Sequence, residues 1–292
     1  MRILVTGATG QVGSRFVPRL LQRTAGPAHG GGDSVRVLVR DEARAEPFTR
    51  LGAEAVVGEL RDAADVRKAV EGADAVLNIA ASFRGVPDEE SWAVNRDAAL
   101  DLGRAAADAG VTRFVQVSTN LVYGEGRGRP CLEDDGPAPR TLPWGVYPRA
   151  KTEAEAGLAE LARERGLDLR VARLAFVYGE GDPHLAQSMR WAGSWATHQR
   201  LHMVHHADVA QGLLRVLYSA DAAGRTYNIA DDAPVTAVEL HQLNGVEVPA
   251  DMAGRPLSDP WEGIVSTLRI RDELGFRPLY PSVWTARDAG AL

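Results

Sequence analysis

The chain has 292 residues, of which 45% are hydrophobic and 25% charged, a composition typical of a folded globular protein. Its net charge of −6 argues against nucleic acid or an anionic membrane as a partner, and no stretch approaches the roughly 18 apolar residues of a membrane span. The single cysteine, Cys131, excludes an internal disulfide, and a first strand that starts at Met1 leaves no room for a signal peptide, so we expect a cytoplasmic protein. No metal-ligand spacing is present, so we expect no metal site.

The first expected element is a strand at residues 1–6, a short apolar run typical of buried parallel strands. It leads into the glycine-rich segment 7–13 and then into an amphipathic stretch with helical spacing. Strand, glycine-rich turn and helix are the context that a dinucleotide-binding fingerprint requires, here with the spacing G-x-x-G-x-x-G. The first glycine would permit a tight turn, the second would let a pyrophosphate approach the backbone, and the third would let the helix pack closely. The expected cofactor contacts are Gly7, Thr9, Gly10, Gln11, Val12 and Gly13.

The second expected strand, residues 35–39, ends at Arg40. An acidic residue at this position accepts hydrogen bonds from the ribose hydroxyls of NAD, whereas an arginine pairs with the 2′-phosphate of NADP. Arg40 therefore favours NADP(H), with Arg15 and Arg44 as further candidates for binding the phosphate. The alternative is that Arg40 is only a solvated strand end and that Asp41 binds the ribose, which would make NAD(H) the cofactor.

Strand and helix patterns alternate up to about residue 178. This alternation predicts an α/β fold of the Rossmann type, a doubly wound parallel sheet with right-handed crossovers. Further strands are expected at 53–57, 74–80, 113–117 and 167–172, and helices at 63–70, 91–109 and 150–165.

Tyr147 precedes Lys151 by four residues, and the chain has only one other lysine, Lys68, among its 33 basic residues. On a helix this spacing places both side chains on one face, one turn apart. The ammonium group would then lower the tyrosine pKa from about 10 and make the hydroxyl a proton donor and acceptor near neutral pH. The alternative is a surface pair without a function.

The glycine-rich turn and the Tyr147–Lys151 pair together resemble the short-chain dehydrogenase/reductase superfamily, in particular its extended branch, the NAD(P)-dependent epimerase/dehydratase family. Four further segments resemble stretches of this family in the expected order: 118–124, 173–182, 204–210 and 224–230. The resemblance implies an NAD(P)-binding Rossmann domain at 1–178, to which 204–230 return, and a small substrate-binding part at 179–203 and 231–292. Family members commonly form homodimers, which implies pairing through the helices expected at 91–109 and 150–165.

The resemblance also implies the catalytic roles. Tyr147 would donate the proton that a reduced ketone needs, or remove it in the oxidising direction. Lys151 would lower the pKa of Tyr147 and hydrogen-bond the nicotinamide ribose. Thr119 takes the family's catalytic Ser/Thr position, with Ser118 as its neighbour, and would hold the substrate oxygen.

Cofactor contacts are implied after the third and fourth strands as well. Glu59 and Leu60 stand where family members contact the adenine edge. Ala80 and Ala81 end the fourth strand, where small residues would let the backbone lie against the cofactor. Asn95 matches a family asparagine that stabilises the sheet near the active site, and its alternative is an ordinary polar residue of a helix.

Departures from the family's pattern reduce the number of reactions that this chain is expected to catalyse. Asn120 and Leu121 stand where the sugar-nucleotide 4,6-dehydratases carry an aspartate and a glutamate that eliminate water, so a dehydratase of that type is not expected. Phe176 replaces an asparagine with which many epimerases contact the substrate phosphate, while Arg200 remains a candidate diphosphate contact. The expected substrate contacts are Ser82, Thr119, Asn120, Phe176, Trp191 and Arg200.

Three functions remain open from the sequence. The first is an NADP(H)-dependent ketoreductase acting on a keto group of a nucleotide-linked sugar or another secondary metabolite. The second is an NAD-dependent nucleotide-sugar epimerase that oxidises, turns and re-reduces its substrate on one retained cofactor. The third is a dinucleotide-binding sensor without turnover, against which the intact set of Thr119, Tyr147 and Lys151 argues.

Overall fold

The fold is described from a computed structural model that covers residues 1–26, 32–139, 144–257 and 259–292. Among these residues, seven strands form one sheet in the order β10-β6-β5-β4-β1-β2-β3. The pairings of β1 with β2 and β4, of β2 with β3 and of β4 with β5 are parallel, which confirms the expected doubly wound sheet. The strands are β1 (Arg2–Thr6), β2 (Ser34–Val39), β3 (Glu54–Val57), β4 (Ala75–Asn78), β5 (Arg113–Thr119), β6 (Asp168–Leu174) and β10 (Thr226–Ile229).

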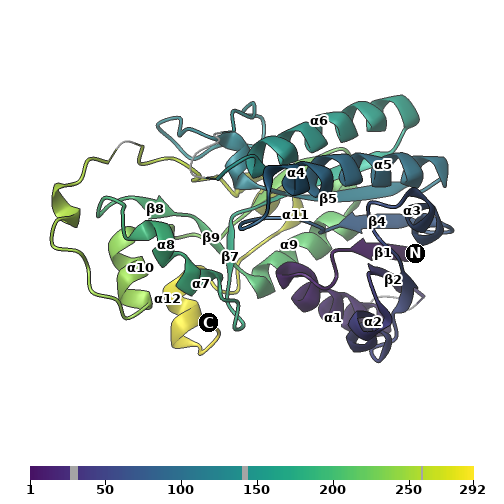
Figure 1. Ribbon diagram of the computed structural model, residues 1–292, viewed down its shortest axis with the longest axis horizontal. Coiled ribbons are helices and arrows are strands. Elements are labelled where there is room, and N and C mark those ends of the chain that lie inside the picture. The colour runs from purple at the N-terminus through teal and green to yellow at the C-terminus, as the bar shows by residue number, and fades with distance from the viewer. Residues whose placement is uncertain (27–31, 140–143, 258) are drawn as a thin grey trace. The chain divides into compact units, whose positions relative to one another are not determined.

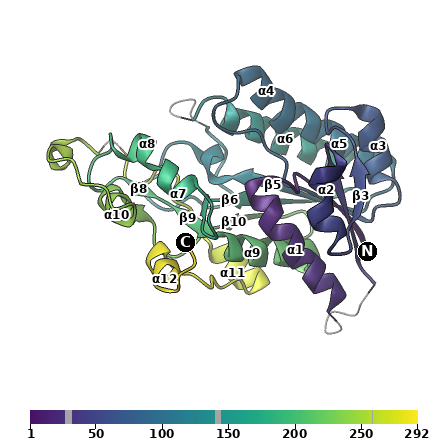
Figure 2. The same cartoon turned by 60° about the horizontal axis from the view of Figure 1, so that its bottom comes forward.

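Helices cover both faces of these strands. Figure 1 shows α5 and α6 side by side on one face and α1 on the other, and Figure 2 shows the same arrangement from a second direction. None of the helices in the described part of the chain is long and apolar enough to cross a membrane. The helices associated with the sheet are α1 (Gln11–Ala25), α2 (Glu42–Thr49), α3 (Ala63–Val70), α4 (Asp88–Trp92), α5 (Ala98–Asp108), α6 (Tyr147–Arg165) and α9 (His206–Tyr218).

The described residues divide into two compact units. The first takes its residues from 1–118, 140–172 and 213–226, and the second from 119–139, 173–212 and 227–292. The roles expected for residues 1–178 with 204–230, and for 179–203 with 231–292, stay predictions. The second unit contains β7 (Phe176–Tyr178) paired with β9 (Met203–His205), β8 (Arg200–Leu201) paired with β11 (Val235–Thr236), and α7 (His184–Gln187), α8 (Met189–Ala192), α10 (Ala237–Leu243), α11 (Leu268–Leu274) and α12 (Val283–Asp288).

Local chemistry sets the ends of several helices in the first unit. Asp62 accepts hydrogen bonds from the N–H groups of Ala64 and Asp65, so it caps α3, whose bounds equal those expected. Helix α6 begins at Tyr147, three residues earlier than expected, because Pro148 suits the first helical turn. It ends at Gly166, whose φ of +70° is the left-handed conformation of a helix C-cap.

The helix expected at 91–109 is interrupted, so that prediction was wrong in one respect. A π-helical turn, η2 (Ala93–Asp97), separates α4 from α5. Within it, the buried Asn95 side chain donates to the carbonyl oxygens of Ser82 (2.7 Å) and Ser91 (2.8 Å) and accepts from the N–H of Ser82 (3.2 Å). These bonds hold the loop after β4 in place. The extra residue of the π-turn lets the Asn95 side chain reach the backbone of Ser82, and such turns are frequent at functional sites.

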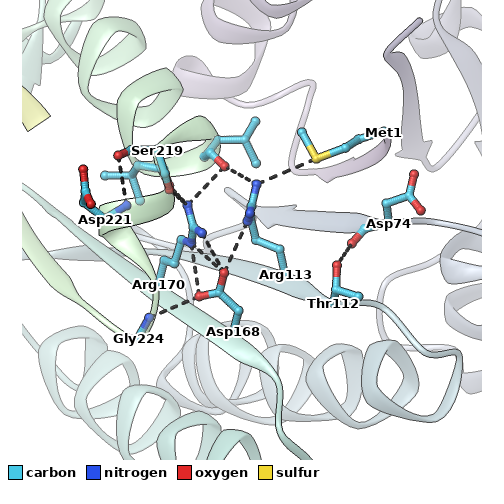
Figure 3. Close-up of polar contacts among 11 residues, drawn as sticks. Met1, Asp74, Thr112, Arg113, Asp168, Arg170, Ser219, Asp221 and Gly224 are labelled. Atoms are coloured by element: carbon cyan, nitrogen blue, oxygen red, sulfur yellow. Dashed lines mark hydrogen bonds and ion pairs between the residues drawn. The ribbon is translucent and has the colours of Figure 1, made fainter.

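The amino-terminal end of β6 carries an ion pair between the buried Arg170 and the partly exposed Asp168 (Figure 3). Arg170, only 1% exposed, donates three hydrogen bonds to the carboxylate of Asp168 at 2.6–3.1 Å. Its other nitrogen donates to the carbonyl oxygens of Val216 (2.6 Å), Leu217 (3.3 Å) and Ser219 (2.6 Å), the last turn of α9 and the residue after it. Arg170 therefore caps this helix end and joins it to β6.

Candidate active site

The glycine-rich turn between β1 and α1 is tightly constrained by its surroundings. Gly7 has a φ of +71°, and a Cβ atom there would lie 2.5 Å from the nitrogen of Ala80. A Cβ atom on Gly13 would lie 2.1 Å from the carbonyl oxygen of Gly7, so only glycine fits at these two positions. At Gly10 the nearest atom would be 3.4 Å away, and no side chain caps α1 at this residue. The first-turn N–H groups of α1 can therefore be reached by an anion from outside the protein.

Arg40 lies exposed at the end of β2 and has neither a hydrogen bond nor an ion pair with any residue that the structure describes. The neighbouring charges are engaged. Asp41 accepts from the N–H of Arg44 and thereby caps α2, and its carboxylate pairs with the Arg44 side chain at 3.0 Å. Arg15 donates to the backbone and side-chain oxygens of Gln11 at 3.0 and 2.8 Å. Of the described arginines at this strand end, Arg15 and Arg44 already bind protein groups, so Arg40 is the one whose guanidinium group can bind a ligand.

The residues expected to contact the cofactor after β3 and β4 make different contacts with the rest of the protein. The N–H of Glu59 donates to Asp65, whereas the Glu59 side chain is 44% exposed and lies 4.0 Å from Arg61. Leu60 packs against the core of the first unit. After β4, the carbonyl oxygen of Ala80 accepts a hydrogen bond from Lys151.

Tyr147 and Lys151 lie in the first turns of α6. The Lys151 side chain is buried, and its Nζ donates to the carbonyl oxygens of Val117 (3.2 Å) and Ala80 (3.4 Å), which lie near the carboxyl ends of β5 and β4. Burial lowers the pKa of Lys151 to about 8, because desolvation penalises the ammonium form. The Nζ atom is 5.9 Å from the centroid of the partly exposed Tyr147 ring. This arrangement can favour a phenolate on Tyr147 and so support proton transfer.

Three further features near this pair were not anticipated from the sequence. The ring of Phe83 packs on that of Tyr147, with centroids 4.2 Å apart and planes tilted by 36°. Ser118 donates a short hydrogen bond to Glu155, one helical turn after Lys151. The spacing of Glu155 from Lys151, four residues, was visible in the sequence, whereas the position of Phe83 was not.

The third feature is a chain of buried polar groups across three strands. Thr6 Oγ1 donates to Asn78 Oδ1 (2.6 Å), Asn78 Nδ2 donates to Gln116 Oε1 (2.9 Å), and Gln116 Nε2 donates to the carbonyl oxygen of Val117 (2.8 Å). Thr6 pairs with Asn78, and Asn78 with Gln116, in the register of β1, β4 and β5. The chain ends on the carbonyl that also accepts from Lys151, so it fixes this carbonyl in place.

The candidate substrate residues in the second unit are held by their own neighbours. Thr119 caps the short 3₁₀ helix η3 (Asn120–Tyr123) by accepting from the N–H of Leu121 at 3.2 Å. The Asn120 amide donates to the carbonyl oxygen of Gly263 at 2.6 Å. Both side chains are buried, which leaves little freedom for either to move.

Trp191 of the second unit packs between two other aromatic residues. The ring centroid of Trp191 lies 5.7 Å from that of Phe176 and 6.1 Å from that of Trp195. Arg200 is engaged: its guanidinium lies 4.8 Å from the ring centroid of Trp261 and donates to the carbonyl oxygen of Pro260 at 2.7 Å. Within the described residues, no group of three or more His, Cys, Asp or Glu side chains is placed to hold a metal ion.

Comparison with known proteins gives one family and several relatives. The profile of the NAD dependent epimerase/dehydratase family matches residues 3–230. The 4-hydroxy-2-methyl-3-oxo-4-farnesyl-3,4-dihydroquinoline-1-oxide ketoreductase of Stigmatella aurantiaca is 30% identical over 80% of this chain and 70% of its own length.

Two similar solved structures are each 25% identical to this chain. The dTDP-glucose 4,6-dehydratase of Streptomyces venezuelae, solved with NAD bound, has a TM-score of 0.77, and the match covers 99% of this chain and 97% of that one. The UDP-glucose 4-epimerase of Thermus thermophilus, solved in complex with NAD, has a TM-score of 0.73, and the match covers 96% of this chain and 94% of that one.

Proposed function

The chain belongs to the NAD-dependent epimerase/dehydratase family, and from this premise we propose that it is an NADP(H)-dependent ketoreductase with Tyr147 as its acid/base. As a member it is an enzyme of the short-chain dehydrogenase/reductase type that uses a nicotinamide dinucleotide. The proposed substrate is a keto group of a nucleotide-linked sugar or of another secondary metabolite. The observation that carries the proposal is the buried Lys151 ammonium one turn after Tyr147. The ketoreductase of Stigmatella aurantiaca supports the direction of the reaction.

The first unit fits a nicotinamide dinucleotide. The constrained Gly7 and Gly13 shape a turn in which the backbone at Gly10 has room for a pyrophosphate. The exposed Arg40 would hold a 2′-phosphate. The proposed cofactor contacts are Gly7, Thr9, Gly10, Gln11, Val12, Gly13, Arg40, Glu59, Leu60, Ala80, Ala81, Tyr147 and Lys151.

The proposed chemistry assigns one task to each catalytic residue. A nicotinamide cofactor, when bound, would supply the hydride that reduces the carbonyl carbon. Tyr147 gives its phenolic proton to the carbonyl oxygen, which becomes the alcohol, and takes a proton back from solvent. Lys151 stabilises the phenolate that remains on Tyr147, and the Thr119 hydroxyl orients the substrate oxygen. The proposed substrate contacts are Ser82, Thr119, Asn120, Phe176, Trp191 and Arg200.

A second candidate is an NAD-dependent nucleotide-sugar epimerase. The similarity to the UDP-glucose 4-epimerase of Thermus thermophilus over 96% of this chain favours it. Against it stands Phe176, which replaces the asparagine with which many epimerases contact the substrate phosphate. A homodimeric state and a cytoplasmic location remain part of our proposal.

Replacement of Arg40 by alanine tests the cofactor assignment. We expect wild-type protein to bind NADPH more tightly than NADH, and the variant to lose about tenfold in NADPH affinity, since a charge-assisted hydrogen bond contributes about 1.5 kcal/mol or more. The affinity for NADH, which has no 2′-phosphate, should stay within about twofold. Quenching of tryptophan fluorescence gives both dissociation constants.

Arg50→Ala is the matched control, because Arg50 is an exposed arginine of the same region that pairs with Glu46. It should leave the affinities for both cofactors unchanged. Tighter binding of NADH than of NADPH by the wild-type protein would exclude the assignment, as would an equal loss for both cofactors in Arg40→Ala.

A further inference from the structure

Lys151 carries its ammonium group in a place where a positive charge is costly. Its side chain is buried, and the two hydrogen-bond acceptors of Nζ among the described residues are neutral carbonyl oxygens, those of Val117 and Ala80. Carbonyl dipoles reduce the desolvation cost of an ammonium group but do not neutralise it. A buried lysine without an anion nearby tends to lose its proton, and a neutral Lys151 could not stabilise a phenolate on Tyr147.

Glu155 is placed to compensate this charge. It follows Lys151 by four residues on α6, so the two side chains lie on the same helix face, one turn apart. Ser118 at the end of β5, only 3% exposed, donates a short hydrogen bond to Oε1 of Glu155. This bond holds the carboxylate at the strand end where the carbonyl oxygen of Val117 accepts from Lys151.

The other charged groups around Lys151 are engaged elsewhere. On η2, which packs against α6, Arg96 binds Asp97 at 2.7 Å and Glu153 at 3.0 Å. The side chains that approach from β4 and β5 are the neutral amides of Asn78 and Gln116. The negative charge of Glu155 raises the pKa of Lys151 and so opposes the effect of burial. The Tyr147 ring lies one helical turn away on the other side of Lys151.

We propose that Glu155 is a positioning residue of the reaction, which keeps the buried Lys151 ammonium protonated, and that Ser118 aligns its carboxylate for this purpose. The inference rests on the proposed function, because it gives Glu155 its role through Lys151 and Tyr147. A purely structural Glu155 would tie α6 to β5 without affecting the charge of Lys151.

The chain offers a direct readout, because it contains only two lysines. Protein labelled with ¹³C-lysine should give two side-chain Cε signals, one from the exposed Lys68 and one from Lys151. We expect the Lys151 signal of the wild-type protein to titrate with a midpoint near the pKa of about 8. In Glu155→Gln the midpoint should fall by about one pH unit, since loss of a nearby negative charge destabilises the ammonium form.

Three further variants complete the test. Glu155→Asp keeps the negative charge, so its Lys151 midpoint should lie close to that of the wild-type protein. Ser118→Ala should lower the midpoint by less than Glu155→Gln does. Glu160→Gln removes an exposed carboxylate of the same helix and should leave the midpoint unchanged. The Lys68 signal and circular dichroism report whether each variant is folded.

An unchanged Lys151 midpoint in folded Glu155→Gln overturns the proposal, and so does an equal shift in Glu160→Gln. If Glu155→Gln does not fold, Ser118→Ala decides: a lowered midpoint supports the role, and an unchanged one contradicts it. The titration needs neither cofactor nor substrate. Its failure is therefore distinguishable from failure of the proposed ketoreductase activity, which the cofactor and turnover experiments measure.

Discussion

Tyr147→Phe is expected to lower kcat by about 10²- to 10⁴-fold, the contribution that a positioned acid/base group typically makes. The variant lacks only the phenolic hydroxyl, and the ring that packs on Phe83 at 4.2 Å is retained. Folding should therefore be close to that of the wild-type protein, and the affinity for NADPH should fall by no more than about fivefold, the effect of one lost hydrogen bond. The measurement is the rate of NADPH oxidation with any ketone that the wild-type enzyme reduces, together with the dissociation constant of NADPH.

Lys151→Met should behave differently from Tyr147→Phe. Loss of the ammonium group removes both the stabilisation of the phenolate and the proposed hydrogen bond to the nicotinamide ribose. We expect both kcat and NADPH affinity to fall strongly, whereas Tyr147→Phe lowers mainly kcat. A Tyr147→Phe enzyme that retains more than a tenth of the wild-type kcat would exclude Tyr147 as the acid/base.

Arg170→Met is expected to lower the free energy of unfolding by about 3 kcal/mol, the lower end of the range for removing one partner of a buried ion pair, because the Asp168 carboxylate is 23% exposed and keeps Arg113 as a partner. The substitution leaves the Asp168 carboxylate without its three hydrogen bonds from Arg170, although Gly224 and Arg113 still donate to it at 3.1 and 3.4 Å. It also deprives three carbonyl oxygens at the end of α9 of a donor (Figure 3). Urea denaturation followed by circular dichroism measures the loss.

Arg104→Met provides the matched control for this prediction. Arg104 pairs with Asp101 at 2.7 Å on the surface of α5, and both side chains are about 60% exposed. Such pairs contribute about 0–1 kcal/mol, so the control should unfold almost as the wild-type protein does. Equal stability losses in Arg170→Met and Arg104→Met would show that the buried network adds nothing beyond a surface pair.

Local sequence patterns were sufficient to predict the parallel sheet and the glycine-rich turn. The apolar run before Gly7 forms the first strand, and Gly7 and Gly13 are glycines because a side chain at either position would collide with neighbouring backbone atoms. Most of these contacts lie within a few residues along the chain, so the turn could be predicted, and the structure has it where it was expected. The pairing of Tyr147 with Lys151 depends only on helix geometry, so it too could be predicted.

Long-range contacts explain what the sequence did not reveal. The π-turn at Ala93–Asp97 depends on Asn95 reaching the backbone of Ser82, thirteen residues earlier. The polar chain from Thr6 to Gln116 depends on the register of three strands that are far apart in the sequence. The engagement of Arg200 by Pro260 and Trp261 depends on a loop sixty residues later, where no periodic pattern guides prediction.

The nucleotide content of the purified protein is the most direct test of the proposed NADP(H)-dependent reduction. The protein would be denatured, any released nucleotide identified by chromatography, and the emptied protein titrated with NADPH and NADH. We expect no retained NAD, and an emptied protein that binds NADPH more tightly than NADH. Retained NAD together with a preference for NADH would contradict the role of Arg40 and would favour an epimerase, whose reaction regenerates its cofactor in each cycle.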